Sequence, residues 1–139
     1  MNSMKHAKLE DQPAPDARYE TGAGVVDPAP LAGTWYSTDK AARGIVKLVL
    51  TVSNGELIVH AYGACDPSPC DWGEVKGEAF SASVSAHEAM AFTAFYDFGF
   101  METSLAVYHK GGILVLDSFN SFKDGSGRSS YFTREFYHR

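Results

Sequence analysis

Eight short apolar and aromatic segments, separated by turn residues, fill the chain from Gly33 to Tyr137. The segments have the length of strands, and most are joined by short glycine-containing stretches, a pattern typical of consecutive antiparallel strands. Eight such strands can close into a barrel, which leaves no exposed edge strand. The sequence therefore predicts an all-β fold, an eight-stranded antiparallel up-and-down β-barrel. The expected strands are 33–38, 45–52, 56–62, 72–80, 90–98, 101–109, 113–122 and 128–137.

The first thirty residues differ in composition from the rest of the chain. They contain four of its six prolines and show neither helical nor strand periodicity. Such a segment buries too little apolar surface to offset its ordering entropy, about 1–2 kcal/mol per residue. We therefore expect a disordered N-terminal tail at 1–30 and one barrel domain at 31–139.

Charge and hydropathy narrow the classes of partner. The chain has 12 Lys and Arg against 17 Asp and Glu, a formal net charge of -5, and its positive residues are scattered. This distribution does not favour a nucleic-acid partner. No apolar stretch approaches the roughly 20 residues that span a bilayer, and the first thirty residues lack the apolar core of a secretory signal. We expect a cytoplasmic protein that does not bind membranes.

Two cysteines, Cys65 and Cys70, flank a loop that contains two prolines. A disulfide would rigidify this loop, although it would not persist in a reducing cytoplasm, where two loop thiols are the alternative. A zinc site would need four ligands, and His60 is the nearest imidazole. A reactive thiol is the remaining alternative. We expect the loop to shape a rim of the barrel, and we expect no metal and no cofactor, since no glycine-rich phosphate loop opens a helix.

Asn54-Gly55 lies between two apolar segments and predicts a tight hairpin, because a type I′ turn needs positive φ at both central residues. Counting back from this turn gives the pairing of the two strands. One face of the hairpin is then uniformly apolar, so we expect it to line the barrel interior. The expected pairs on that face are Val52 with Leu57, Leu50 with Val59, and Leu48 with Ala61.

The later turns, of two or four residues, preserve the alternation of side chains, so the inner face can be followed through the last four strands. One end of this face is aliphatic and the other is polar. Unpaired buried polar groups destabilise by about 1–3 kcal/mol each, so the polar end implies either a mutual network or a bound partner and water. Its members are Tyr96, Thr103, Ser118, Asn120, Tyr131, Thr133 and Glu135.

The opposite face of the same strands is rich in aromatic residues around an expected cross-strand pair between Asp117 and Arg134. An apolar patch of this kind on a sheet exterior is typical of an interface. We therefore expect a homo-oligomer built on the last four strands. The alternative is that inside and outside are reversed here. The residues concerned are Phe95, Tyr108, Ile113, Val115, Phe119, Phe132 and Phe136.

The run Gly33-Thr34-Trp35-Tyr36-Ser37 resembles the opening strand of the avidin and streptavidin family, and its Gly-x-Trp is also the lipocalin signature. The resemblance implies a calycin-type barrel in which Trp35 closes the floor and Ser37 points inward to a ligand. It also implies an arginine over Trp35, a role for Arg128 or Arg134. The chain departs from avidins in its tryptophans, because Trp72 is the only other one.

These observations favour a small-molecule-binding barrel that takes a mostly apolar ligand into its lumen, since binding sites combine an apolar lining with a few convergent polar groups. The ligand is expected to be a small apolar or amphipathic molecule. The expected ligand-binding residues are Trp35, Ser37, Tyr96, Thr103, Ser118, Asn120, Tyr131 and Thr133.

Two alternatives remain open. The first is a cofactor-free cyclase or isomerase with Glu135 as general acid or base, because an apolar wall favours the protonated form of a carboxyl group. Tyr96 and Tyr131 would then donate hydrogen bonds to developing oxyanions. The alternative for Glu135 is a carboxylate that is exposed at the rim or paired with Arg128. The second alternative is a protein-interaction module whose interior is only a core.

Overall fold

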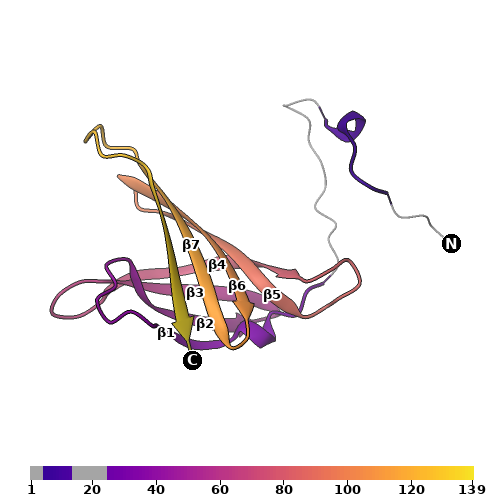
Figure 1. The fold of residues 1–139 in the computed structure, drawn as a ribbon, viewed down its shortest axis with the longest axis horizontal. Coiled ribbons are helices and arrows are strands. Elements are labelled where there is room, and N and C mark those ends of the chain that lie inside the picture. Colours follow the sequence, from indigo (N-terminus) through magenta and orange to yellow (C-terminus); the bar gives the residue numbers. More distant parts are fainter. Residues whose placement is uncertain (1–4, 14–24) are drawn as a thin grey trace.

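The computed structural model describes residues 5–13 and 25–139. Eight antiparallel strands form a closed barrel in the order β1 to β8, which confirms the expected fold (Figure 1). Two short 3-10 turns precede the strands. The elements are η1 (Leu9–Asp11), η2 (Ala29–Leu31), β1 (Gly33–Ser37), β2 (Ile45–Ser53), β3 (Glu56–Gly63), β4 (Cys70–Ser81), β5 (Ala89–Asp97), β6 (Met101–Lys110), β7 (Ile113–Phe122) and β8 (Tyr131–His138).

The segment before β1 takes part in the barrel. Asp27 forms an isolated bridge with Glu88, and η2 brings the fully buried Leu31 into the core. Much of the predicted tail, at 1–4 and 14–24, lies outside the described residues. Among the described residues, contact with the barrel begins at Val26, which packs against the core.

The β2–β3 hairpin has the predicted turn and register. Asn54 and Gly55 have φ values of 52° and 78°, as a type I′ turn requires. The three predicted pairs occur as expected. Leu48, Leu50, Leu57, Val59 and Ala61 are all buried, whereas Val52 at the end of the strand is 40% exposed. The apolar face of this hairpin therefore forms one wall of the core.

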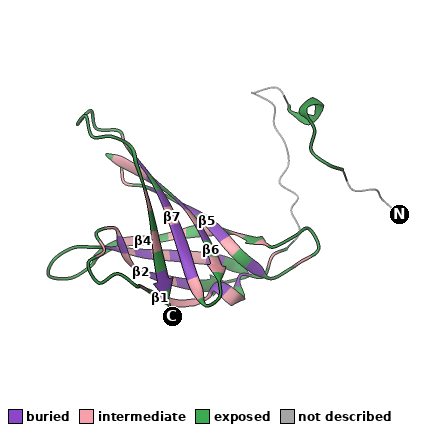
Figure 2. Ribbon diagram, viewed as in Figure 1, coloured by how far each residue is buried: buried purple, intermediate pink, exposed green. Residues whose placement is uncertain are grey.

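Side-chain alternation also holds through the last four strands. On the inner face, Phe92 and Leu116 are each 1% exposed, whereas Phe119 and Phe132 on the outer face are about half exposed. Figure 2 shows the buried residues running along the strands, with exposed residues in the loops. The inside and outside of these strands are therefore not reversed. Val115 is the exception to this alternation, because it lies on the outer face but is only 6% exposed.

The barrel closes unevenly between its first and last strands. β1 pairs with β8 at Tyr36 with His138 and at Ser37 with Tyr137. The first half of β8 instead faces the β1–β2 loop, where Glu135 approaches Gly44. In Figure 1, strands β6 to β8 cross the β2–β4 strands steeply. The end of the barrel at the β1–β2, β3–β4 and β7–β8 loops, here called the mouth, is therefore open.

Trp35 closes the opposite end. Its side chain is fully buried, and its Nε1–H donates to the carbonyl oxygen of Leu31 at 3.0 Å. The guanidinium of Arg139 lies 4.3 Å from the centre of the Trp35 ring and donates to the carbonyl oxygens of Pro30 and Ala32. A buried ring, a short 3-10 turn and the C-terminal arginine thus seal this end together.

The expectation that Arg128 or Arg134 covers Trp35 is wrong. Arg128 precedes β8 at the mouth and pairs with Asp124 at 2.8 Å. Arg134 lies in the middle of β8 on the outer face. Because β8 runs from the mouth toward the closed end, only a residue after its last position reaches Trp35, and that residue is Arg139.

The predicted pair between Asp117 and Arg134 is present on the outer face. Arg134 donates from Nε and Nη2 to the two carboxylate oxygens of Asp117, at 2.6 and 2.9 Å. These hydrogen bonds, opposed by partial burial, hold the pKa of Asp117 below its ordinary value. A depressed folded-state pKa stabilises the protein above the unfolded-state value, about 3.9, and this contribution is lost as the pH falls through the folded-state value.

We expect Asp117→Asn to lower the free energy of unfolding at neutral pH, and the difference from the wild type to shrink below about pH 4. Urea unfolding of both proteins across the acid range measures this difference. Glu88→Gln, a carboxylate for which no ion pair occurs among the described residues, is the control. A deficit of Asp117→Asn that stays constant between neutral pH and pH 2 would contradict the assignment.

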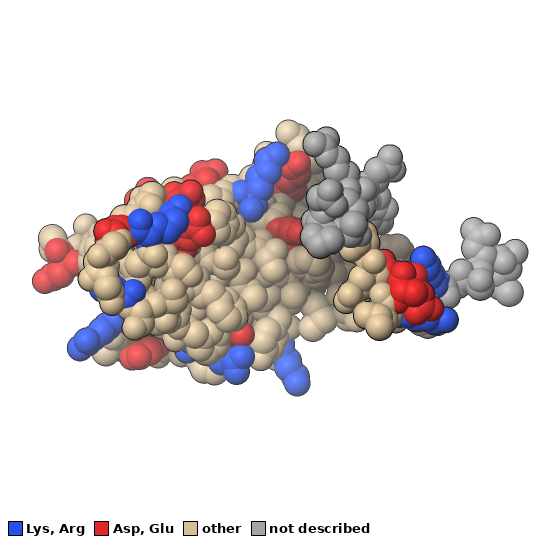
Figure 3. Space-filling view, turned by 90° about the horizontal axis from the view of Figure 1, so that it is seen from above, with Lys and Arg blue, Asp and Glu red and all other residues tan. Residues whose placement is uncertain are grey.

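Charged side chains of both signs are interspersed on the face shown in Figure 3. Near the mouth, Lys123 forms ion pairs with two acidic residues, because its Nζ lies 2.9 Å from a carboxylate oxygen of Asp97 and 2.9 Å from one of Glu102. Within the described residues, no helix has the length and apolar character to cross a membrane, since both helical turns have three residues.

Candidate functional site

A cavity of about 300 Å³ lies at the mouth of the barrel. It is enclosed by the first half of β8, the end of β7, and the loops that follow β1 and β3. A larger groove of about 650 Å³ lies at the other end, but its border includes Val25, next to residues outside the described range. The mouth cavity combines apolar walls with converging polar groups, so it is the candidate site.

One wall of the cavity is a hydrogen-bonded polar network. The Thr103 hydroxyl donates to Oδ1 of Asn120 at 2.8 Å, and Nδ2 of Asn120 donates to Oγ of Ser118 at 2.9 Å. The same amide lies 3.4 Å from the carbonyl oxygen of Tyr131. All three side chains of the network are buried. Asn120 is thus oriented by the protein, while Ser118 keeps its hydroxyl hydrogen for an acceptor.

Glu135 forms the acidic part of the same wall. The single hydrogen of the Tyr137 hydroxyl is shared between two acceptors, the carbonyl oxygen of Ile45 at 2.6 Å and Oε2 of Glu135 at 3.0 Å. Burial, followed by the nearby Glu135 carboxyl, raises the pKa of Tyr137 well above its ordinary value, so this hydroxyl stays a donor. Tyr137 therefore fixes one carboxyl oxygen of Glu135.

The other oxygen of Glu135, Oε1, lies beside Gly44. A methyl group on Gly44 would lie 3.2 Å from Oε1, so the missing side chain leaves this oxygen accessible. Gly44 itself lines the cavity. The site thus presents a carboxylate with one oxygen, Oε2, held by Tyr137 and the other, Oε1, left accessible beside Gly44.

The apolar wall centres on Trp72 of β4. A Cβ on Gly63 would lie 2.6 Å from Nε1 of Trp72, so only glycine lets the indole lie against β3. The edge of the indole packs on Tyr96 and Phe98, with ring centres 5.4 and 5.0 Å apart. Met101 adds a flexible apolar side chain to this wall. The cavity is therefore lined by an aromatic ring as well as by a carboxylate.

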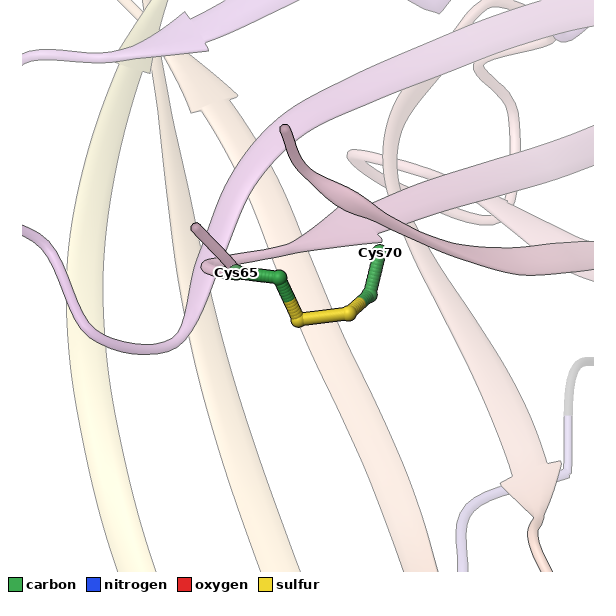
Figure 4. Close-up of a disulfide and its surroundings, with 2 residues drawn as sticks. All are labelled: Cys65 and Cys70. Atoms are coloured by element: carbon green, nitrogen blue, oxygen red, sulfur yellow. A yellow bond between two sulfur atoms is a disulfide. The ribbon is translucent and has the colours of Figure 1, made fainter. Parts of the chain in front are cut away.

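A disulfide between Cys65 and Cys70 forms the rim (Figure 4). It links the end of β3 to the start of β4, and both cysteines line the cavity. The structure thus selects the disulfide among the alternatives left open by the sequence. Within residues 5–13 and 25–139, no three His, Cys, Asp or Glu side chains gather in an arrangement that would hold a metal ion.

The structure brings together most of the residues predicted for the polar end. Ser118, Asn120, Tyr131, Thr133 and Glu135 all line the mouth cavity. Tyr131 is 48% exposed and stands at the rim, with its ring stacked near Phe122. Thr103 lies behind Asn120 and supports it, so it contributes by positioning the amide.

Trp35 and Ser37 do not line the cavity. Trp35 lies at the closed end of the barrel. The Ser37 hydroxyl accepts a hydrogen bond from the backbone N–H of Asp39 and lies 3.1 Å from the carbonyl oxygen of the same residue. It therefore stabilises the start of the β1–β2 loop, whereas the residues of this loop that line the cavity are Arg43 and Gly44 at its end.

Tyr96 does not line the cavity either, because its hydroxyl serves the backbone. It accepts from the N–H of Ala61 at 3.1 Å and lies 2.9 Å from the carbonyl oxygen of Gly73. The β3–β4 register shifts between His60 and Tyr62, so these two backbone groups lack their usual ladder partners. Burial, the largest influence, raises the pKa of Tyr96.

Sequence reasoning missed Trp72 and Gly44 as site residues. Side chains alternate along β4, and Val75 and Gly77 point into the barrel, so an unbroken strand would point Trp72 outward. The bulge before Glu74 adds one residue to the strand and turns Trp72 inward. Gly73, with φ of 82°, is the signal that was available, because an isolated glycine within a strand often marks a bulge. Gly44 carries no comparable signal, since its role depends on a contact with β8.

No protein-family model, curated protein or solved structure matches this chain.

Proposed function

We propose that the barrel binds a small, mostly apolar molecule in the mouth cavity. The observation that carries this proposal is the mixed lining of the cavity, in which the apolar side chains of Trp72 and Met101 meet the polar side chains of Ser118 and Glu135. Ligand sites generally pair an apolar lining with a few fixed polar groups. A volume of about 300 Å³ lies at the lower end of the range for such sites, which favours a small ligand.

The polar wall indicates which chemistry the ligand carries. Within the described residues Oε1 of Glu135 has no hydrogen-bond partner, whereas Oε2 is engaged with Tyr137, so Oε1 can accept a hydrogen bond from a ligand in the cavity that Glu135 lines. Arg43 is exposed at the rim and thus remains solvated. A ligand whose polar end is a donor, such as an amine or a hydroxyl group, therefore complements the site, and its apolar part packs on Trp72.

Glu135→Gln tests this orientation. With n-octylamine and n-octanol as probes, we expect the wild type to bind the amine about tenfold more tightly, a difference of about 1.4 kcal/mol, because the ammonium group forms a charge-assisted hydrogen bond with the carboxylate. In Glu135→Gln we expect the preference to fall to about twofold or less. Isothermal titration calorimetry measures both affinities.

Glu56→Gln is the matched control for this experiment. Glu56 pairs with Lys76 at the far end of the barrel, so its replacement changes the net charge equally without touching the cavity. We expect this variant to keep the wild-type preference. Equal preferences in Glu135→Gln and the wild type would rule out Glu135 as the polar anchor.

A cofactor-free cyclase or isomerase is the second candidate. It is favoured by one observation, a carboxyl group on a cavity wall with a tyrosine hydroxyl 3.0 Å away. The Tyr96 hydroxyl is committed to the backbone, so the donor to an oxyanion would be Ser118 or Tyr131. Mass spectrometry after incubation with polyene substrates would detect this activity, and Glu135→Gln would abolish turnover if the assignment holds.

We also propose that the barrel is calycin-like. The resemblance at Gly33-Thr34-Trp35 implies a floor tryptophan covered by an arginine near the end of the last strand. Trp35 and Arg139 have this relation, and the arginine also donates to backbone carbonyls on either side of Leu31. These contacts support a calycin relationship more than they support a biotin site, which would need further tryptophans around the ligand.

A further inference from the structure

The outer surface of β5 to β8 carries an unusual concentration of exposed rings. Phe95, Tyr108, Phe119, Phe132 and Phe136 are between 38% and 51% exposed, and we call them the aromatic face. They stand in two rows of paired residues across the four strands, separated by one row of smaller and charged residues. The rows are Phe95, Ser104, Phe119 and Phe132; Thr93, Ala106, Asp117 and Arg134; and Ala91, Tyr108, Val115 and Phe136.

The aromatic face is neutral although the chain is acidic. Within these three rows the charged residues are Asp117 and Arg134, and they pair with each other. The formal net charge of -5 therefore resides elsewhere in the chain. Two copies can meet on this face without like-charge repulsion. Moreover, a two-fold rotation places the Arg134 side of one pair opposite the Asp117 side of the other, so the pair is complementary to itself.

The shape of the face is also self-complementary. A shallow groove of about 500 Å³ is lined by the small residues Thr93, Ser104 and Ala106, by Phe95 and Phe119, and by two residues of opposite charge on β4, Lys76 and Glu78. Beside it stands a ridge, in which the rings of Phe119 and Phe132 lie 5.2 Å apart. In a two-fold interface the same patch serves both partners, so the ridge of one copy can fill the groove of the other.

The exposed area suits a dimer. An aromatic side chain presents about 150–250 Å², so five rings that are about half exposed offer on the order of 500 Å². A stable interface buries about 800 Å² per partner, and the small residues between the rings supply much of the remainder. The strands follow one another around a closed barrel, and the rings of the aromatic face lie on its outer surface, so association through these rings occurs face to face.

We propose that the protein forms a two-fold symmetric dimer through the aromatic face, with the ridge of each copy in the groove of the other. The Asp117–Arg134 pairs of the two copies lie antiparallel near the symmetry axis. This dimer leaves the mouth cavity open, because the cavity is lined by inner-face and loop residues. It is therefore independent of the proposed function.

Phe119→Glu tests the dimer by sedimentation equilibrium. We expect the wild type to be dimeric at micromolar concentration and the variant to dissociate with a constant raised at least about 100-fold, because a charge replaces a central ring in both copies. Phe100→Glu is the matched control, since Phe100 is 48% exposed in the β5–β6 turn outside the face. Circular dichroism establishes that each variant is folded.

Complementary charge variants test the two-fold arrangement separately. Asp117→Arg and Arg134→Asp each place like charges opposite one another across the axis, so each should be monomeric alone. An equimolar mixture should form a heterodimer. A mixture that stays monomeric while the wild type is dimeric would overturn this arrangement. A monomeric wild type at about 100 μM, weaker than typical specific complexes, would overturn the dimer and leave the face to a different partner.

Discussion

Replacing Trp35 with alanine is expected to lower the free energy of unfolding by about 3–5 kcal/mol. The indole is fully buried, and its N–H bonds the carbonyl oxygen of Leu31. It also packs edge-on against His109, with ring centres 5.3 Å apart, and lies beneath Arg139. The variant would therefore leave both a cavity and an unpaired backbone carbonyl. Urea unfolding followed by circular dichroism measures the loss.

Trp72→Ala provides the comparison for this prediction. It removes the same side chain from a partly buried position at the mouth, where open space already adjoins the ring. The loss of stability is expected to be smaller, because the cost of a truncation rises with the cavity it creates. A loss for Trp35→Ala no larger than that for Trp72→Ala would show that the closed end does not anchor the barrel.

Tyr96→Phe is expected to destabilise the barrel by about 1–3 kcal/mol without altering the affinity for n-octylamine. The substitution keeps the buried ring but removes the hydroxyl that serves the N–H of Ala61 and the carbonyl of Gly73. Both backbone groups would remain buried beside the bulge without a partner. Thermal and urea unfolding measure the first effect, and calorimetric titration measures the second.

Tyr36→Phe is the matched control, since this tyrosine is 49% exposed on the outer surface. Its hydroxyl is accessible to water, so the change in stability should stay within about 0.5 kcal/mol. A Tyr96→Phe variant with unchanged stability and weakened binding would contradict this role. It would mean that the hydroxyl bonds the ligand, as the sequence suggested, and that Ala61 and Gly73 find other hydrogen-bond partners.

The alternation of side chains was predictable because it is a local property. The Asn54-Gly55 turn fixes the register of its hairpin, and two-residue turns carry the pattern onward without loss. For this reason the burial of Asn120 and the exposure of Phe119, its neighbour, both follow from the sequence. For the polar end of the inner face the pattern allowed either a mutual hydrogen-bond network or a bound partner and water. Thr103, Asn120 and Ser118 form such a network.

Contacts that depend on how the barrel closes could not be predicted from the sequence. The offset between β1 and β8 decides that Arg139 covers Trp35, and no local pattern encodes that offset. The same offset separates the first half of β8 from β1 and brings Glu135 beside Gly44. The sequence placed Glu135 on the inner face, but the hydroxyl that fixes its orientation became visible only with the Tyr137 contact.

The most direct test of a ligand site at the mouth is an NMR titration with n-octylamine that follows the two tryptophan indole N–H resonances. The Trp72 indole borders the cavity, whereas the Trp35 indole is bonded to Leu31 at the closed end. We expect the Trp72 resonance to shift and saturate while the Trp35 resonance stays in place. A titration in which neither resonance moves, or in which both move together, would contradict the site.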